Sequence, residues 1–448
     1  MRTIFNFVTL ALSTLSLNAV VACADVPEPP VSQGPIRVEI RKTPEGFGLF
    51  RGGEPYFVKG AGGSKYLDRL VAAGGNSIRT WHAGQLKLTL DDAKEHGLTV
   101  AAGLWLGHER HGFKYSDAQA VTKQKEEVRQ AVLANQSHPA LLLWGIGNEM
   151  EGDGHDPQIW QAVNDIAKMI KEIDPYHPTM TVIAGTGEDK IRQLRQFCPD
   201  IDVIGINMYG DLSGLPAALK KQELDRPYIL TEFGPTGWWQ VAKTPWGEEI
   251  EPTSTEKAKT YLDSYRAAVA SQRRSCLGSY AFMWGSKQEH TRTWFGMFLP
   301  SGEPTGVVDA MQFAWTGSWP ANRCPEIAKL DAGISGGPPP APAGATQVYP
   351  PRTELACRAD ARDPEGGVLK VVWELRSASS DKRSGGDREE EPPAHPDAIV
   401  RADGLTATIR TPPAAGPYRV FVYVFDEKGN AATANLPILV KDKDKDSR

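Results

Sequence analysis

The stretches W-G-I-G-N-E at Trp144–Glu149 and I-L-T-E-F-G at Ile229–Gly234 decide the fold of this chain. Each is a short and nearly continuous apolar run, which is typical of a strand buried on both faces of a parallel sheet. Each run carries a glutamate at its carboxyl end, where closed barrels of parallel strands present their functional groups. We therefore expect Glu149 and Glu232 to approach each other across the mouth of a barrel.

Two carboxyl groups placed in this way indicate cleavage of a glycosidic bond. That chemistry needs one carboxylic acid that stays protonated, to donate to the leaving oxygen, and one carboxylate that attacks or stabilises an oxocarbenium-like centre. A glutamate at a strand end is also often a solvated or arginine-paired group. For Glu149 the position directly after Asn148 at a barrel rim favours the catalytic interpretation.

Eight apolar runs alternate with amphipathic segments between Tyr56 and Trp315, which predicts an α/β fold, a (β/α)8 TIM barrel. The expected strands are Tyr56–Ala61, Asn76–Trp81, Leu98–Trp105, Ala140–Glu149, Thr179–Ala184, Asp202–Tyr209, Tyr228–Phe233 and Leu277–Trp284. The expected helices include Leu88–His96, Lys123–Ala134, Trp160–Ile173 and Glu256–Ser271. A doubly wound sheet is the alternative, but the sequence contains neither of the glycine-rich nucleotide-binding motifs that would favour it.

The 448-residue length suits a barrel followed by a smaller domain. The expected layout is a tether and short hairpin over 25–44, the barrel over 45–322, a Pro/Gly-rich linker over 323–347, a small all-β Ig-like sandwich over 348–442 and a charged tail over 443–448. Six short alternating runs beyond the linker predict the sandwich. The polar insert Ser377–Pro393 is expected to be a disordered loop, and the module a spacer or a weak glycan contact.

The first residues are typical of an export signal, expected over 1–24. Arg2 precedes a mostly apolar stretch, Ile4–Val21. Val20-Val21-Ala22-Cys23 resembles a bacterial lipobox that would lipidate Cys23, whereas Ala22-Cys23-Ala24 resembles a site that releases a soluble chain. The lipobox is favoured, because a cysteine there by chance is uncommon. We expect a periplasmic or cell-surface protein that meets the membrane only through a lipid on Cys23.

The charge of the chain limits the kinds of partner that it is expected to bind. A formal net charge of −5 and a pI near 6.0 give no electrostatic reason to expect nucleic acid. The expected partner is a carbohydrate. No cofactor and no metal ion are expected, and the chain is expected to be a monomer. Cys198 and Cys276 are expected to be buried thiols. Cys324 and Cys357 flank the linker, and they are expected to form a disulfide between the domains.

Polar and aromatic residues gather where the expected strands end. Trp105 and Trp284 fit a sugar platform and rim packing equally well. The long segment 234–253 carries Trp238, Trp239 and Trp246, which are expected to line the cleft because a loop offers little core to bury them. His82 and His108 lack a third ligand at a metal-binding spacing. Glu151, Asp153 and Asp156 most simply form an acidic loop, with a calcium site as the minor alternative.

These segments resemble the barrel of glycoside hydrolase clan A, and most of all the catalytic domain of family 2 β-glycosidases. The resemblance covers roughly residues 45–315 and includes F-R-G-G-E-P-Y-F-V-K-G at Phe50–Gly60. It implies a retaining mechanism through a covalent glycosyl-enzyme, with Glu149 as acid/base and Glu232 as nucleophile. The residues to which it gives substrate-binding or supporting roles are Asn148, Arg79, His82, Tyr209 and Trp284.

The sequence leaves two alternatives to hydrolysis of a β-linked oligo- or polysaccharide. An aromatic loop after the nucleophile strand also suits a sugar acceptor, which would make the protein a β-glucan transglycosylase that uses the same residues. A non-catalytic polysaccharide-binding protein could keep the fold as well. The presence of both glutamates argues against pure binding, since a binder has no need of the pair.

Overall fold

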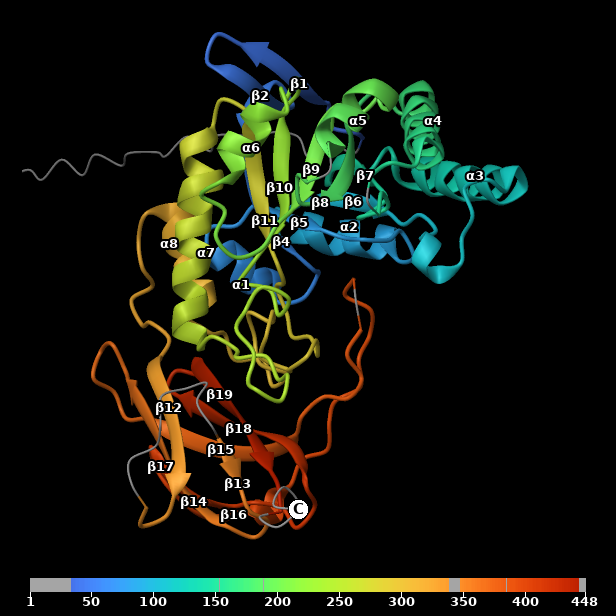
Figure 1. Cartoon of the computed structure of the whole chain (residues 1–448). Coiled ribbons are helices and arrows are strands. Elements are labelled where there is room, and N and C mark those ends of the chain that lie inside the picture. Colours follow the sequence, from blue (N-terminus) through green and yellow to red (C-terminus); the bar gives the residue numbers. More distant parts are fainter. Residues whose placement is uncertain (1–33, 153, 188, 338–346, 384, 443–448) are drawn as a thin grey trace, which may run out of the picture.

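The computed structural model describes residues 34–152, 154–187, 189–337, 347–383 and 385–442 (Figure 1). The expected signal peptide with Cys23, the start of the tether, the proline-rich centre of the linker and the charged tail lie outside the described residues. In the described part of the chain, no helix is long and apolar enough to cross a membrane.

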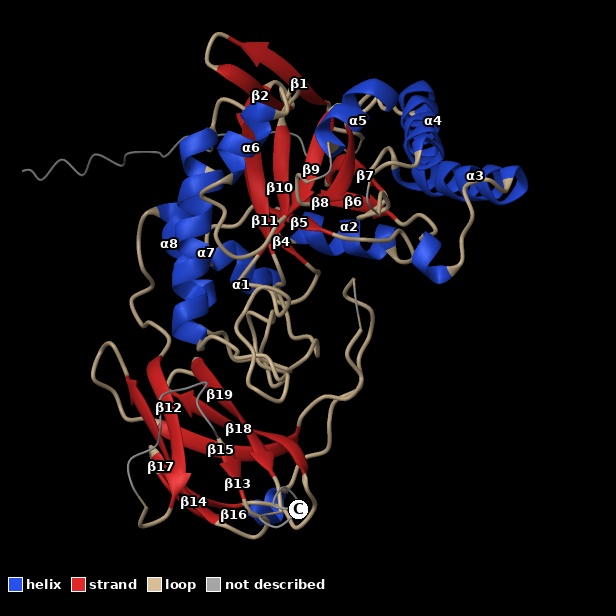
Figure 2. Ribbon diagram, in the orientation of Figure 1, coloured by secondary structure: helices blue, strands red, loops and turns tan. Residues whose placement is uncertain are grey.

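Eight parallel strands close into a barrel, in the order β10-β11-β4-β5-β6-β7-β8-β9 (Figure 2). Their bounds are β4 Val58–Gly62, β5 Ser77–Arg79, β6 Thr99–Leu104, β7 Leu141–Ile146, β8 Thr179–Ala184, β9 Val203–Asn207, β10 Tyr228–Phe233 and β11 Cys276–Ala281. The (β/α)8 barrel predicted from the alternating runs is therefore confirmed. Several strands are shorter than expected, because the chain turns at the rim before the last apolar residue of the run.

The helices surround the barrel (Figure 2). They are α1 Leu67–Ala72, α2 Leu86–Glu95, α3 Ala118–Asn135, α4 Pro157–Ile173, α5 Lys190–Phe197, α6 Leu215–Lys221, α7 Ser254–Ala268 and α8 Gly306–Thr316, with short 3-10 turns η1 Glu109–His111 and η2 Ala270–Gln272. Side chains that precede the helices fix some of their starts. Asp117 caps α3 and Asp156 caps α4, while Thr253 and Glu256 form a capping box at α7.

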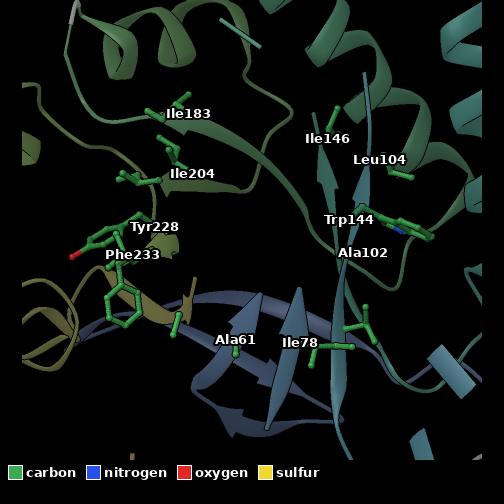
Figure 3. Close-up of a cluster of buried hydrophobic side chains, with 14 of the residues drawn as sticks. Ala61, Ile78, Ala102, Leu104, Trp144, Ile146, Ile183, Ile204, Tyr228 and Phe233 are labelled. Atoms are coloured by element: carbon green, nitrogen blue, oxygen red, sulfur yellow. The ribbon is translucent and has the colours of Figure 1, made fainter. Parts of the chain in front are cut away.

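Most residues of the barrel strands are buried, because both faces of the barrel wall are covered. All six residues of β7 are buried, and Figure 3 shows side chains of neighbouring strands packed in the core. At the amino-terminal ends of the strands lies a three-stranded antiparallel sheet, β1 Val38–Thr43, β2 Gly46–Arg51 and β3 Glu54–Tyr56. Val38 and Leu49 belong to the apolar cluster at this end, which leaves the opposite end for the site.

The C-terminal domain is a β-sandwich of two four-stranded sheets, ordered β12-β14-β17-β16 and β13-β19-β18-β15 (Figure 2). The strands are β12 Glu326–Ile334, β13 Val348–Tyr349, β14 Glu354–Arg362, β15 Lys370–Ser377, β16 Ile399–Asp403, β17 Thr406–Arg410, β18 Gly416–Phe425 and β19 Ala431–Val440, with a 3-10 turn η3 Pro396–Ala398. The prediction of a small all-β domain is confirmed. One part of the linker prediction is wrong, since β12 is a strand paired along its length with β14.

The predicted disulfide between Cys324 and Cys357 is also wrong, because both are free, buried thiols. Cys324 Sγ lies 3.6 Å from the carbonyl oxygen of Pro304, on the barrel side. Cys357 lies on β14, opposite Ala332 in the sandwich core. Cys198 and Cys276 are buried free thiols as well, as expected.

Direct contacts between the sandwich and the barrel join the two domains. The backbone N–H of Ile327 donates to Thr255 Oγ1 at 2.8 Å, and that of Thr433 donates to Ser254 Oγ at 2.9 Å. The guanidinium of Arg419 reaches Glu248 Oε2 at 3.2 Å in a buried position. Three separate strands thus hold the sandwich against the start of α7 and the long loop that precedes it.

Candidate active site

Glu149 lies in a sharp turn beyond strand β7. The strand ends at Ile146, and the chain then passes through Gly147 at φ 70°. A Cβ atom at Gly147 would lie 2.6 Å from Cγ of Met150, so the turn requires glycine. Glu149 has φ 52°, a left-handed conformation that costs a non-glycine residue on the order of 1–2 kcal/mol. Strain of this kind concentrates at functional sites.

Glu232 lies near the end of β10 and accepts hydrogen bonds from three side chains. Arg79 Nη1 and Trp81 Nε1 each donate to Oε1 at 2.8 Å. The hydroxyl of Tyr209 donates to Oε2 at 2.6 Å. Three donors on two oxygens suit a carboxylate, which is acceptor-only when ionised.

The glycine of the T-E-F-G segment makes room for one of these donors. A Cβ atom at Gly234 would lie 3.0 Å from Cδ1 of Tyr209, so a larger residue would push the ring away from the carboxylate. Met208 N–H, next in the chain, donates to the carbonyl oxygen of Glu232 at 2.9 Å. The segment after β9 is thereby fixed against the end of β10.

The amides of Asn207 and Asn148 link the two glutamates. Asn207 Nδ2 donates to Glu149 Oε1 at 2.9 Å and to Asn148 Oδ1 at 3.1 Å. The hydroxyl of Thr231 donates to Asn207 Oδ1 at 2.8 Å, which orients this amide with its NH2 group toward Glu149. Arg79 Nη2 donates to Asn148 Oδ1 at 2.6 Å, so one guanidinium holds both Glu232 and the residue before Glu149.

The two carboxyl groups differ in their surroundings. Burial raises the pKa of Glu149 from 4.5 to about 7, and the nearby negative charge of Glu232 adds to the rise. The hydrogen bond from Asn207 opposes the rise without cancelling it. A carboxyl group with this pKa can hold a proton near neutral pH and release it in a reaction.

Both glutamates line a cavity of about 780 Å³ at the carboxyl ends of the strands. Aromatic and polar groups from loops that follow several strands form its walls. The other lining residues are Trp81, Trp105, Asn148, Ala184, Gly185, Asn207, Met208, Tyr209, Trp238, Trp239, Gln240, Phe282, Met283, Lys287, Glu289, Phe295, Gly385, Gly386 and Asp387.

Several residues singled out from the sequence meet in this cavity. Trp105 is 40% exposed and stacks on His108 at 4.7 Å between ring centroids. Trp239 is 50% exposed, and its ring meets Tyr209 edge-on. Trp238 also lines the cavity and stacks on His290. Such aromatic faces suit the apolar faces of sugar rings.

Three expected site residues lie elsewhere. His82 is exposed and does not line the cavity, because the chain after β5 turns so that Trp81 faces inward instead. Trp284 is fully buried, with Nε1 donating to the carbonyl oxygen of Tyr66 at 3.1 Å. It packs against Phe298, which makes it a packing residue and not a sugar platform. Trp246 does not line the cavity either, and its Nε1 is buried.

Other cavity residues were not singled out from the sequence. Trp81 lines the cavity in place of the neighbouring His82, and an aromatic residue directly after a barrel strand is the sequence signal that marks it. Phe282 and Met283, joined by a cis peptide bond, follow β11 where Trp284 was expected. Gly385, Gly386 and Asp387 come from the other domain, and no local pattern could have placed them here.

The acidic loop after Glu149 has a structural role. Glu151 Oε1 accepts from Lys190 Nζ at 2.9 Å and from the backbone N–H of Ala184 at 2.8 Å. Asp156 caps α4, and Asp153 lies outside the described residues. Over the described ranges, no group of three His, Cys, Asp or Glu side chains is arranged to hold a metal ion.

A closed parallel barrel with two glutamates facing one cavity is the architecture of a barrel glycosidase. Residues 67–289 match the model of the family described as glycosyl hydrolases family 2, TIM barrel domain. The barrel domain therefore belongs to glycosyl hydrolase family 2, whose members are retaining O-glycosidases.

Solved structures of three enzymes are similar to this chain. An FMN-binding β-glucuronidase from Facaelibacterium prausnitzii L2-6 is 16% identical, with a TM-score of 0.52 over 91% of this chain and 59% of that one. A β-glucuronidase from an uncultured Clostridium sp. is 17% identical, with a TM-score of 0.50 over 63% and 54%. A β-galacturonidase from Eisenbergiella tayi is 17% identical, with a TM-score of 0.49 over 64% and 55%. This chain spans little more than half the length of these enzymes, and the likeness shows the fold alone.

Proposed function

We propose that the protein cleaves a β-linked sugar with retention of configuration, through a covalent glycosyl-enzyme on Glu232. The observation that carries this proposal is the contrast between the two carboxyl groups of one cavity. Glu232 accepts from Arg79, Trp81 and Tyr209, as a nucleophilic carboxylate requires, whereas burial keeps Glu149 a weak acid.

In the first step, Glu232 attacks the anomeric carbon while Glu149 donates its proton to the leaving oxygen. In the second step, Glu149 accepts a proton from water, which attacks the glycosyl-enzyme and restores free Glu232. Asn148 has its carbonyl oxygen occupied by Arg79 and Asn207, so its NH2 group is the part that would meet the sugar. We assign this group to the 2-hydroxyl, where a hydrogen bond strengthens in the transition state.

The charge of the cavity favours a neutral sugar. Among the described residues that line it, Lys287 is the cation, and its Nζ is already paired with Glu289 Oε2 at 2.6 Å. Glu232, Glu289 and Asp387 contribute carboxylates to the same walls. A uronic acid would place a further carboxylate among them, at an electrostatic cost. Although the β-glucuronidases named above act on uronides, we therefore propose neutral β-glycosides for this protein.

The test combines a substrate panel with trapping of the intermediate. Purified protein is incubated with aryl β-glycosides of neutral hexoses and with the matched β-glucuronide, and kcat/KM is measured for each. A 2-deoxy-2-fluoro glycosyl fluoride of the best sugar should label the peptide that contains Glu232, as read by mass spectrometry. A label on another residue would overturn the nucleophile assignment, and preference for the glucuronide would overturn the neutral sugar.

Transfer to a sugar acceptor is the second candidate. It is favoured by Trp239, which is half exposed on the loop after the nucleophile strand and offers an aromatic face to an acceptor. Product masses after incubation with a β-linked oligosaccharide distinguish the two reactions. Products longer than the substrate indicate transfer, and shorter products alone indicate hydrolysis.

We also propose export, with a lipid anchor on Cys23, from the sequence of residues 1–24. Expression in a bacterial host with a labelled fatty acid tests this. Incorporation of label that is lost in Cys23→Ser supports the anchor, and a soluble unlabelled product of the full chain contradicts it.

A further inference from the structure

The described residues of the polar insert between β15 and η3 form a loop that reaches the barrel (Figure 1). In the figure it rises in orange-red from the sandwich toward the mouth of the barrel. Ser377 N–H donates to the carbonyl oxygen of Pro393 at 3.0 Å, which closes the base of the loop. Higher up, Glu390 N–H donates to Asp381 Oδ2 at 2.9 Å. We call residues 381–383 and 385–390 the sandwich loop.

Buried contacts fix one side of the sandwich loop to the barrel. Lys382 Nζ donates to Glu249 Oε2 at 2.7 Å, and Glu249 is only 2% exposed. Glu389 Oε2 accepts from the backbone N–H of His290 at 2.7 Å, and both residues are buried. Because charged groups are rarely buried unless they are paired, these contacts define one position for the loop.

The tip of the sandwich loop meets the barrel on a second side. The carbonyl oxygen of Gly385 accepts from Arg110 Nη2 at 3.2 Å, and Asp387 Oδ2 lies 3.0 Å from His111 Nε2. Gly386 approaches Lys287 so closely that an added Cβ would lie 2.9 Å from its Nζ. The tip thus spans from η1, which follows β6, to the segment that follows β11.

Between β11 and β6 in the barrel order lie β4 and β5, whose own loops are short. β4 ends at Gly62 and α1 begins at Leu67, while β5 ends at Arg79 and α2 begins at Leu86. The barrel therefore builds little wall over this part of its rim. Gly385, Gly386 and Asp387 line the cavity that holds the two glutamates.

We propose that the sandwich loop is the missing wall of the sugar site and that Asp387 binds hydroxyl groups of the substrate. The inference rests on the proposed function and gives the C-terminal domain a part in substrate binding in place of a spacer role. The hydrogen bond with His111 lowers the pKa of Asp387, and a carboxylate can accept hydrogen bonds from sugar hydroxyls. Arg110 and His111 hold the carboxylate in place as positioning residues.

The first test compares two acidic residues of the same domain. Asp387→Ala should raise KM for a β-linked oligosaccharide about tenfold, the effect of one hydrogen bond to a charged group, with a smaller change in kcat. Asp397→Ala is the matched control, because Asp397 is exposed on η3 and does not line the cavity. Its KM should equal that of the wild type. Equal KM values for all three proteins would overturn the proposal.

A second variant removes the wall as a whole. Asp381 and Glu390 are hydrogen-bonded to each other, so residues 382–389 can be replaced by two glycines without a change in the base of the loop. This variant should lose at least as much kcat/KM as Asp387→Ala. A variant that keeps wild-type kcat/KM would overturn the proposal.

Binding measurements distinguish a wrong proposal for the sandwich loop from a wrong proposal for the function. The oligosaccharide Kd is measured by calorimetry in a Glu232→Ala background, with and without Asp387→Ala. A tenfold weaker Kd in the double variant supports the wall even if turnover is slow. Unchanged Kd with an active wild type overturns the wall alone. A wild type that neither binds nor cleaves any sugar of the panel overturns both proposals.

Discussion

The indole N–H of Trp81 donates to Glu232 Oε1 at 2.8 Å, on the same oxygen that the guanidinium of Arg79 reaches. Trp81 also lines the cavity, and its ring meets Phe282 edge-on. One side chain that follows β5 therefore holds the carboxylate of Glu232, the proposed nucleophile, and also forms part of the cavity wall.

Replacing Trp81 by Phe should separate these two roles. The apolar ring is retained, but the hydrogen bond to a charged acceptor is lost, so kcat/KM should fall roughly 10- to 100-fold. Because packing is kept, the melting temperature should stay close to that of the wild type. Steady-state kinetics with one aryl glycoside measure the effect, and unchanged kcat/KM would show that the indole N–H does not support the nucleophile.

The two glutamates should respond differently to truncation. Glu232→Ala should abolish turnover of every substrate, because no other group can form the glycosyl-enzyme. Glu149→Ala should retain activity on substrates with good leaving groups, since the first step then needs no acid, and azide should restore turnover as a replacement nucleophile. Kinetics with a nitrophenyl and an alkyl glycoside, with and without azide, measure this. Equal loss on both substrates without rescue would contradict the assigned roles.

The pKa of Glu149 sets the expected pH profile. Burial raises this pKa to about 7, and only the protonated form can donate to the leaving oxygen. The rate on a poor leaving group should therefore fall as pH rises through about 7, by about tenfold for each further pH unit. A dinitrophenyl glycoside, which needs no acid in the first step, is the control. The same alkaline fall for both substrates would point to a group other than Glu149.

The barrel could be predicted because its signal is local. Each strand, such as Tyr228–Phe233, is an apolar run of the right length, and glutamates at strand ends are visible in the sequence. It is harder to predict from the sequence which of two neighbouring residues faces the cavity. Trp81 and His82 differ by one position, and only the turn after β5 decides between them.

Burial by segments that are distant in the sequence explains the other predictions that the structure overturns. Trp284 follows its strand as a sugar platform would, but Tyr66 and Phe298 cover it. The sandwich loop is polar and looks disordered from composition alone, yet its charges find buried partners such as Glu249 on the barrel. These outcomes depend on tertiary contacts that no spacing in the sequence reveals.

Two tryptophans of the loop after β10 should behave in opposite ways. Trp239 is half exposed in the cavity, so Trp239→Ala should weaken oligosaccharide binding by about 1–3 kcal/mol and leave thermal stability nearly unchanged. Trp246 does not line the cavity, and its Nε1 is buried. Trp246→Ala should therefore lower the melting temperature and leave affinity intact. Calorimetry and thermal melts on both variants test this, and affinity lost only in Trp246→Ala would refute it.

Asp309 should make stability fall as pH rises. It lies on α8 with its Oδ2 accepting from the backbone N–H of Cys324 at 2.6 Å, and burial raises its pKa from 3.8 to about 6. Between these values the folded state binds more protons than the unfolded state, so stability decreases from about pH 4 to pH 6 and stays lower above pH 6.

Asp309→Asn keeps an acceptor for Cys324 without the buried charge. Its melting temperature should exceed that of the wild type by a few degrees at pH 8, and the advantage should shrink as pH falls below about 6. Asp397→Asn, at an exposed position, should show no such dependence. An advantage for Asp309→Asn that is the same at pH 8 and pH 4 would mean that the variant acts through packing and not through the charge.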